Sequence, residues 1–430
     1  MHISIHRSWL FVLSMWWVSI ATYSIPAGAQ APGNSTSDGT PLTLSAALDL
    51  ALKASPDLAA ARRELAATDG TLVQAQARPN PHLSYLLEDT RQATRATTLQ
   101  INQLVELGAK RAARINAAER GRDIAAAELA SRQTEIRALV IAAFFDLLVA
   151  QERTSLAQDA VELARRAAAA AAKRVQAGNI SPVEEIKARV AESNARMELS
   201  QAQSDLITAR QSLARTWNDP LPRFSKAVGA LDALPELPTL PELQARLTNS
   251  PNLRRARLEI ERRQALADLE RAKRVPDLTL SLGVKRDEQL GRDQAVIGVS
   301  VPLPIFDRNR GNLLEALMRE DKARDEQVLI ENRLTNEALE ARQRLSAAHT
   351  QAETLGLEVL PVAHSAYEAT SKGFQLGKFT FLDVLDAQRT LFHAKSQRLR
   401  AVAEAHRAAA DIDRLVGDTP RIADGPRGQP

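Results

Sequence analysis

The stretch Phe374-Gln-Leu-Gly-Lys-Phe-Thr-Phe-Leu-Asp-Val-Leu-Asp-Ala-Gln388 decides the fold that we expect for this chain. It contains a helix stop that is followed at once by a helix start. Gly377 can adopt the left-handed conformation that ends a helix, and Thr380 and Asp383 have the spacing of a capping box that begins the next one. The stretch therefore predicts the turn of a helical hairpin.

A similar turn is expected earlier, in Val175-Gln-Ala-Gly-Asn-Ile-Ser-Pro-Val-Glu-Glu185. Here Gly178 would end one helix, Ser181 would cap the next, and Glu184 would complete a capping box. Pro182 suits the first helical position. The glycines of the two turns are 377 − 178 = 199 residues apart.

Other landmarks recur at nearly the same spacing. Ser55-Pro56 breaks one helical pattern and starts another, and Ser250-Pro251 does the same 250 − 55 = 195 residues later. Pro81 and Pro276 share this offset. The chain is therefore expected to contain an internal duplication. The expected segments are a signal peptide at 1–29, a flexible N-terminal segment at 30–40, a first repeat at 41–219, a proline-rich connector at 220–238, a second repeat at 239–417 and a C-terminal tail at 418–430.

Composition favours closely packed helices over a thick globular core. Aromatic residues make up 4% of the 430 residues, and alanine is abundant. The 56 basic and 52 acidic residues nearly balance, which does not indicate a nucleic-acid binder. Arg7, the apolar run from Trp9 to Ala21 and the small residues Ala27-Gly-Ala29 form the pattern of an export signal. The alternative is an uncleaved membrane anchor, for which the apolar run is short.

Each repeat contains two expected strands, at about 83–88 and 98–105 in the first and at about 277–284 and 294–301 in the second. Leu280, Leu282 and Val284 alternate with small or polar residues. This pattern is typical of a membrane β-barrel, and equally of a soluble sheet that packs on helices. Four strands cannot close a barrel, and open strand edges are not tolerated in lipid. Membrane strands would therefore require several chains to share one barrel.

Very long helices are expected between the strands and the two turns. Only one glycine and no proline lie between Gly108 and Gly178, which allows a helix of roughly 100 Å. Its apolar residues recur every seven positions, which indicates left-handed packing against neighbouring helices. A second long helix is expected from Asn312 to Gln375, where Pro361 would bend it, and its return from Phe381 to Leu415.

Together these features resemble the TolC-type outer-membrane efflux channel family. The two turns and Leu376–Ala387 carry the resemblance most specifically, and Leu104–Ile115 is similar to the heavy-metal, CzcC-like branch. The resemblance implies a mainly α fold with a small membrane β part, built from a duplicated strand and long-helix-hairpin repeat. It further implies a homotrimer in the outer membrane of a Gram-negative bacterium. The trimer would form a 12-stranded β-barrel that is continued by a periplasmic α-helical barrel.

The same resemblance implies partners and a function. The partners would be a periplasmic adaptor (membrane fusion) protein, an inner-membrane proton-driven pump of the resistance–nodulation–division type, and outer-membrane lipid. The protein would be a passive export duct in a tripartite efflux system for heavy-metal cations. It would not be an enzyme and would need no cofactor. Alternatives are a drug-efflux or type I secretion channel and, from another class, a periplasmic coiled-coil adaptor or binding protein.

Five residues are implied to form the pore constriction. Asp383 and Asp386 match acidic positions of the family, and a trimer would gather 3 × 2 = 6 carboxylates that attract cations. Asp383 is explained equally well as a capping acid, whereas Asp386 lies beyond the first helical turn. Glu184 matches an acid that helps to close the aperture, although a capping role fits equally. Phe379 replaces the gating arginine and Phe374 a gate tyrosine, so the charge network of the family's gate is not reproduced.

The implied adaptor-docking residues lie at the two turns, where turn and cap roles are compatible with docking. They are Arg174, Gly178, Ser181, Gly377 and Thr380. The basic residues Lys110, Arg111 and Arg114 follow a strand and would either lie near lipid headgroups or form a solvated helix face. The histidines are scattered without metal-ligand spacing, so no metal site is expected.

Overall fold

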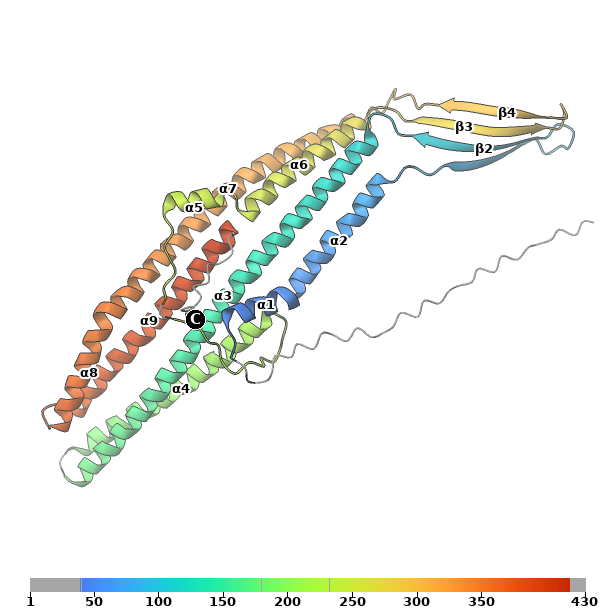
Figure 1. The fold of residues 1–430 in the computed structure, drawn as a ribbon. Helices are drawn as coiled ribbons and strands as arrows, with labels where there is room; N and C mark the ends of the chain where they lie inside the picture. The colour runs from blue at the N-terminus through green and yellow to red at the C-terminus, as the bar shows by residue number, and fades with distance from the viewer. Residues whose placement is uncertain (1–38, 40, 179, 232, 418–430) are drawn as a thin grey trace, which may run out of the picture.

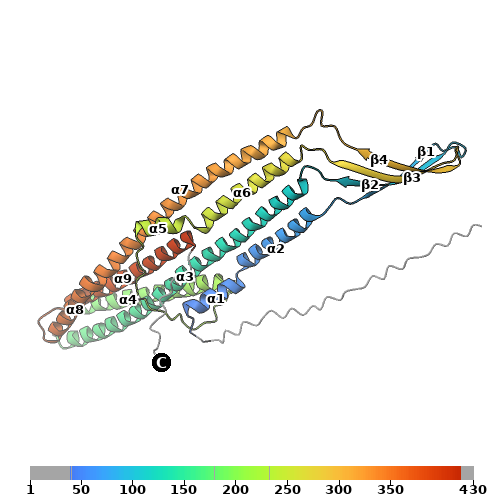
Figure 2. The same ribbon diagram turned by 45° about the horizontal axis from the view of Figure 1, so that its top comes forward.

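The computed structural model describes residues 39, 41–178, 180–231 and 233–417. The molecule is a long rod with a β-sheet at one end and two helical hairpin turns at the other (Figures 1 and 2). The expected signal peptide at 1–29 and tail at 418–430 lie outside the described residues, as does nearly all of segment 30–40.

The same order of elements occurs twice, which confirms the duplicated fold. The first half contains α1 (Leu44–Ala54), α2 (Pro56–Gln76), β1 (His82–Glu88), β2 (Ala96–Val105), α3 (Lys110–Gln176) and α4 (Pro182–Arg215). The second half contains α5 (Leu240–Leu247), α6 (Pro251–Ala272), β3 (Leu278–Asp287), β4 (Arg292–Ser300), α7 (Arg310–Thr354), the π-helical turn η1 (Leu355–Val359), α8 (Leu360–Gln375) and α9 (Phe381–Val416). Each pair of short helices is separated at a Ser-Pro step, because the serine takes an extended backbone and the proline suits the first helical turn.

The two halves meet in one antiparallel sheet of order β1-β2-β3-β4, in which β2 pairs with β3. Residues that pair directly share a face. Leu83, Ile101, Leu282 and Ile297 follow one another across the sheet on one face. This face is open, with Leu282 66% and Ile297 80% exposed. Among the described residues, no helix is both long and apolar enough to cross a membrane.

The other face of the sheet is polar and internally hydrogen-bonded. Asn102 Nδ2 donates to Ser84 Oγ (3.1 Å), and Ser281 Oγ donates to Asn102 Oδ1 (2.6 Å). Gln100 Nε2 also donates to Asn102 Oδ1 (3.2 Å) and faces Gly283 on the next strand. The sheet therefore exposes an apolar face while its polar side chains satisfy one another.

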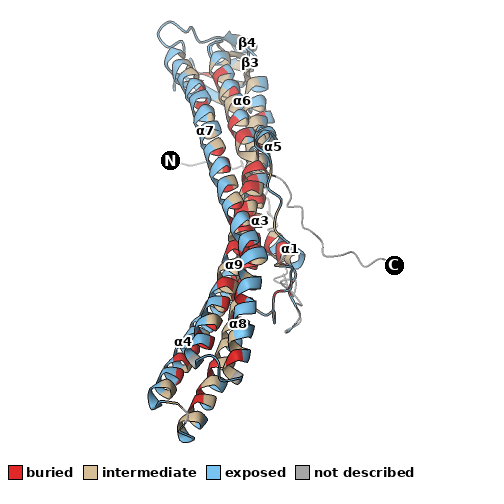
Figure 3. Ribbon diagram, turned by 90° about the vertical axis from the view of Figure 1, so that its left-hand side faces the viewer, coloured by how far each residue is buried: buried red, intermediate tan, exposed pale blue. Residues whose placement is uncertain are grey.

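The helical part is held together by alanine-rich seams and two larger apolar clusters. Buried residues follow the contacts between neighbouring helices rather than a central core (Figure 3). One cluster joins α1, α3 and the end of α4 around Phe144, Leu147 and Leu213. The other joins α5, α7 and α9 around Leu243, Leu345 and Leu415. The alanines allow helix axes to approach closely, as the seven-residue pattern predicts.

The connector after α4 lies along the middle of the rod. Ala227 forms a parallel bridge with Leu42, and the side chain of Gln151 on α3 pairs with its backbone. The amide of Gln151 accepts from Ala227 N at 2.8 Å and donates to Ala227 O at 3.0 Å. The buried Ala227 thus obtains the backbone partners that a second strand would supply.

Pro361 does not break the long second-half helix. The preceding turn, Leu355–Val359, is π-helical, and the backbone N–H of Leu360 bonds to Leu355 O. Proline has no N–H to donate, and its ring crowds the carbonyl one turn earlier. The wider turn accommodates this crowding while the helix continues.

Candidate functional site

The second hairpin turn is stabilised by a reciprocal cap. Thr380 N donates to Asp383 Oδ2 (2.7 Å), and Asp383 N donates to Thr380 Oγ1 (3.3 Å). Gly377 has φ +75°, a conformation that glycine adopts at no steric cost. Hydrogen bonds from the Thr380 side chain and backbone lower the pKa of Asp383. Asp383 is therefore an exposed carboxylate that caps α9.

Asp386 lies one helical turn further along α9. It is exposed and takes no part in the cap. Residues three apart share a helix face, so Asp383 and Asp386 lie on one side of the hairpin. The start of α9 therefore bears two exposed carboxylates at the end of the rod opposite the sheet (Figure 1).

The first turn differs from the sequence expectation at Glu184. Gly178 has φ +73°, and Ser181 Oγ accepts from Val183 N at 3.3 Å. Because Ser181 Oγ is directed at Val183 N, Glu184 does not complete a capping box in the described turn. Instead, the Glu184 carboxylate pairs with Lys187 at 3.5 Å. The expectation that Glu184 completes a capping box was wrong.

Arg174, beside the first hairpin turn, contacts Phe374, beside the second hairpin turn. The guanidinium of Arg174 lies 4.3 Å from the centroid of the Phe374 ring, and its Nη2 donates to Phe374 O at 3.5 Å. Phe374 and Leu385 also pack on alanines of α3 and α4. The sequence analysis proposed separate roles for Arg174 and Phe374, whereas the structure brings them together. Their offset of 374 − 174 = 200 nearly equals that of the turns, so the two residues occupy equivalent places in the two repeats.

Phe379 packs within its own hairpin. Its ring occupies the space beside Gly373, where a Cβ atom would collide with it. The side chain is 46% exposed. Phe379 stands where the resemblance implies an arginine. It therefore contributes an apolar contact where a charge was expected.

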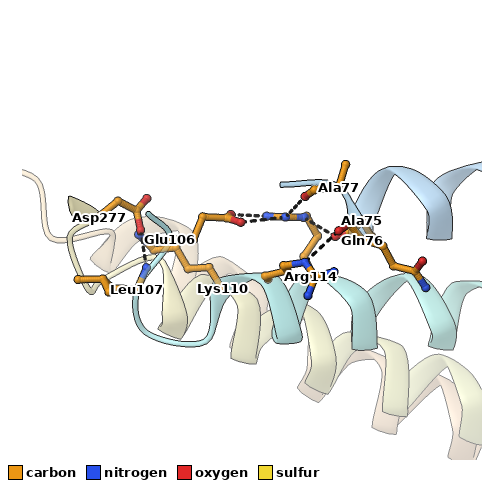
Figure 4. Close-up of polar contacts among 9 residues, drawn as sticks. Ala75, Gln76, Ala77, Glu106, Leu107, Lys110, Arg114 and Asp277 are labelled. Atoms are coloured by element: carbon orange, nitrogen blue, oxygen red, sulfur yellow. Dashed lines mark hydrogen bonds and ion pairs between the residues drawn. The ribbon is translucent and has the colours of Figure 1, made fainter. Parts of the chain in front are cut away.

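At the opposite end of the helices, basic residues fasten the sheet to the rod (Figure 4). Lys110 Nζ lies 2.6 Å from Asp277 Oδ1, and the backbone N–H of Leu107 donates to the same oxygen at 3.0 Å. The Lys110 side chain is only 11% exposed. This ion pair links the first repeat to the second at the point where strand becomes helix.

Arg114 closes the same joint from the other side. It donates to both oxygens of Glu106 (2.5 and 3.1 Å) and to the carbonyls of Ala75 and Ala77, each at 3.1 Å. Arg111 Nε donates to Gln76 O at 2.9 Å. Carbonyls at a helix C-terminus lack partners within the helix, so these arginines cap α2. The hydrogen bond to Glu106 raises the pKa of Arg114.

Lys110 and Arg114 are therefore part of the joint rather than of a solvated helix face, whereas Arg111 is exposed. A position near lipid headgroups stays a prediction. Apart from Glu106, the partners of this basic cluster are distant in sequence, and the spacing of its residues did not reveal them. Across the described residues, no group of three or more His, Asp or Glu side chains could hold a metal ion.

Comparison with known proteins assigns the family. The profile of the family described as outer membrane efflux protein matches residues 47–219 and 243–418. The chain is 50% identical over 377 residues to the cobalt-zinc-cadmium resistance protein CzcC of Cupriavidus metallidurans, covering 88% of this chain and 90% of that protein. It is 28% identical over 282 residues to the nickel and cobalt resistance protein CnrC of the same organism, covering 63% and 66%.

A solved structure shares the fold. The crystal structure of CusC superposes with a TM-score of 0.75 at 16% identity, covering 87% of this chain and 92% of that one. The family profile matches both repeats, and the fold extends over sheet and helices alike. This chain belongs to the outer membrane efflux protein family and is an efflux channel of the outer membrane.

Proposed function

We propose that this protein is the outer-membrane duct of a tripartite efflux system that exports heavy-metal cations. The observation that carries the choice of substrate is the 50% identity to a cobalt-zinc-cadmium resistance protein over 88% of the chain. The exposed Asp383 and Asp386 support it, because a ring of carboxylates attracts cations and repels anions. The duct itself would be passive.

The working unit would be a homotrimer. One chain supplies four strands, and its outer strands β1 and β4 each have an unpaired edge. Open edges are not tolerated in lipid, and the apolar face of the sheet is exposed. Three copies would give 3 × 4 = 12 strands, enough to close a barrel around the polar face. Helix α3, with 67 residues, spans roughly 100 Å and would form the wall of a periplasmic tunnel.

The hairpin turns would meet a periplasmic adaptor, which in turn would contact an inner-membrane pump. Gly178, Ser181, Gly377 and Thr380 are all exposed at the tips. Arg174 is half-buried against Phe374, so its role would be to join the two hairpins before docking. Exposed apolar side chains at the tips, including Ile186 and Leu376, would give the adaptor a surface to bury.

Loss of the gene tests the substrate. We expect a deletion strain to become sensitive to zinc, cadmium and cobalt salts and to retain more of these metals, with both effects reversed by the intact gene. Sensitivity to drugs with unchanged metal tolerance would instead support a drug-efflux duct. A defect in protein export alone would support a secretion duct.

Conductance tests the acidic constriction. In planar bilayers, replacing both Asp383 and Asp386 by asparagine should lower the ratio of cation to anion permeability. Asp57→Asn removes an exposed carboxylate at the start of α2, far from the turns, and should leave the ratio unchanged. Equal ratios in all three proteins would remove the acidic ring from the proposal and leave the duct intact.

A further inference from the structure

Two helix flanks remain uncovered beside the sheet. The helices that adjoin it form a layer in the order α2, α3, α6 and α7, so α2 and α7 lie at opposite edges (Figures 1 and 2). These edges continue the unpaired strands β1 and β4. In an antiparallel closure between copies, the end of β4 would lie beside the start of β1 of the next copy. The α7 flank of one copy would then face the α2 flank of the next.

The free flank of α7 is apolar with two acidic residues. Glu320 and Ala323 are buried on α7, which packs against α6. An exposed row is centred about 120° around the helix from Glu320 and about 180° from Ala323, at 100° per residue. The row consists of Leu314, Met318, Asp321, Asp325 and Val328. Large apolar side chains exposed along one helix face indicate a surface that another helix covers.

The free flank of α2 carries small residues and one base, with the exposed Val73 and Gln74 nearer the sheet. Leu58, Leu65 and Leu72 are spaced seven apart, and Leu58 packs with residues of α3 in the first apolar cluster. An exposed side about 130° around the helix carries Ala59, Arg63, Ala66 and Gly70. A Cβ atom at Gly70 would meet nothing within 4 Å in this chain. The flank is therefore shallow, which suits the larger side chains of α7.

The two rows also match in height above the sheet. At 1.5 Å per residue, Gly70 lies about 9 Å from the sheet-side end of α2. Leu314 and Met318 lie about 6 and 12 Å from the sheet-side end of α7. Arg63 lies at about 20 Å, between Asp321 at about 16 Å and Asp325 at about 22 Å.

The charges are available for such a contact. Within the described chain, Arg63 and Asp325 take part in no ion pair. Asp321 lies 3.0 Å from Arg324 on its own helix. A base on one flank thus faces acids on the other at the same level, where neither Arg63 nor Asp325 is neutralised by its own copy.

We propose that α7 of one copy packs along α2 of the next. Leu314 and Met318 would contact α2 on either side of Gly70, and Arg63 would form an ion pair with Asp325. The occupant of each flank is a second copy of this chain. This inference rests on the proposed trimer and adds to it the contact that sets its register.

Crosslinking tests the contact directly, because the chain has no cysteine. We expect Gly70→Cys with Leu314→Cys to give covalent trimers with a short bis-maleimide, since the two positions lie at opposite edges of one copy. The control is Gly121→Cys with Leu314→Cys, because a Cβ atom at Gly121 on α3 also meets open space. The control pair should give no covalent trimer.

A charge-reversal cycle supplies a second test. Arg63→Asp or Asp325→Arg alone should weaken trimer association on the order of fivefold at each contact, and the double variant should recover it. If the unmodified protein is trimeric and yet neither the crosslink nor the recovery is seen, the inference is overturned while the trimeric duct stands. If the unmodified protein is monomeric, the proposed trimer falls as well.

Discussion

Acidification is expected to weaken the middle of the rod through His406. The imidazole stacks on Phe145 of α3 with ring centroids 3.5 Å apart and an interplanar angle of 8°. Its Nε2 is buried and has no hydrogen-bond partner. Burial lowers the pKa of His406 to about 4, although a hydrogen bond with the backbone of Ala233 acts in the opposite direction. The folded protein therefore holds this histidine neutral.

The sign and size of the effect follow from linkage. The unfolded pKa is about 6.5, so the unfolded chain binds a proton at higher pH than the folded chain does. Stability is full above pH 6.5, falls as the pH decreases and levels off below about 4. At about 1.4 kcal/mol per pKa unit, the total loss is about 3 kcal/mol, and about 2 kcal/mol of it is reached at pH 5.

The measurement is thermal unfolding of the detergent-solubilised protein, followed by circular dichroism from pH 7.5 to 4. His406→Phe keeps an aromatic ring on Phe145 but cannot be protonated, so its melting temperature should fall less across this range. His364→Phe, at an exposed position on α8, should behave as the unmodified protein does. Equal pH dependence of the His406→Phe variant and the unmodified protein would refute the reasoning.

Four further changes test the joint, the turns and the long helix α3. Arg114→Leu leaves the carboxylate of Glu106, whose side chain is 13% exposed, without its ion-pair partner. This change should lower the free energy of unfolding by about 2–3 kcal/mol in denaturant titrations. Gly178→Ala, at φ +73°, should destabilise the protein by about 1 kcal/mol. Gly121→Ala inside α3 should stabilise it by about 0.5–1 kcal/mol. A higher melting temperature for Gly178→Ala, or a lower one for Gly121→Ala, would contradict the respective expectation. Arg174→Ala removes a cation–π contact of about 0.5–1 kcal/mol. It should raise the open probability of single channels in bilayers, and an unchanged open probability would exclude a gating role for this contact.

Local signals were sufficient to predict the elements of this fold. The two turns were recognisable because a helix stop and a helix start are properties of a few adjacent residues, as at Gly377 and Thr380. The strands were recognisable because Leu280, Leu282 and Val284 alternate with small residues. Duplication then predicted the order of elements in one half from the other.

Contacts between distant segments could not be predicted in the same way. The β2–β3 register, which places Gln100 opposite Gly283, depends on how the two halves meet. The ion pair of Lys110 with Asp277 depends on that register in turn. Glu184 was assigned to a capping box from spacing alone, but the rotamer of Ser181 favours Val183 N. The pore role of Asp383 and Asp386 stays a prediction, since one chain contains only one third of the proposed ring.

Imaging of single particles purified from the outer-membrane fraction tests the central claim most directly. Three copies should surround one continuous channel, with β4 of each copy paired to β1 of the next and the apolar sheet face turned outward. Particles that contain a single copy, with that apolar face covered by its own helices and no channel through them, would contradict it.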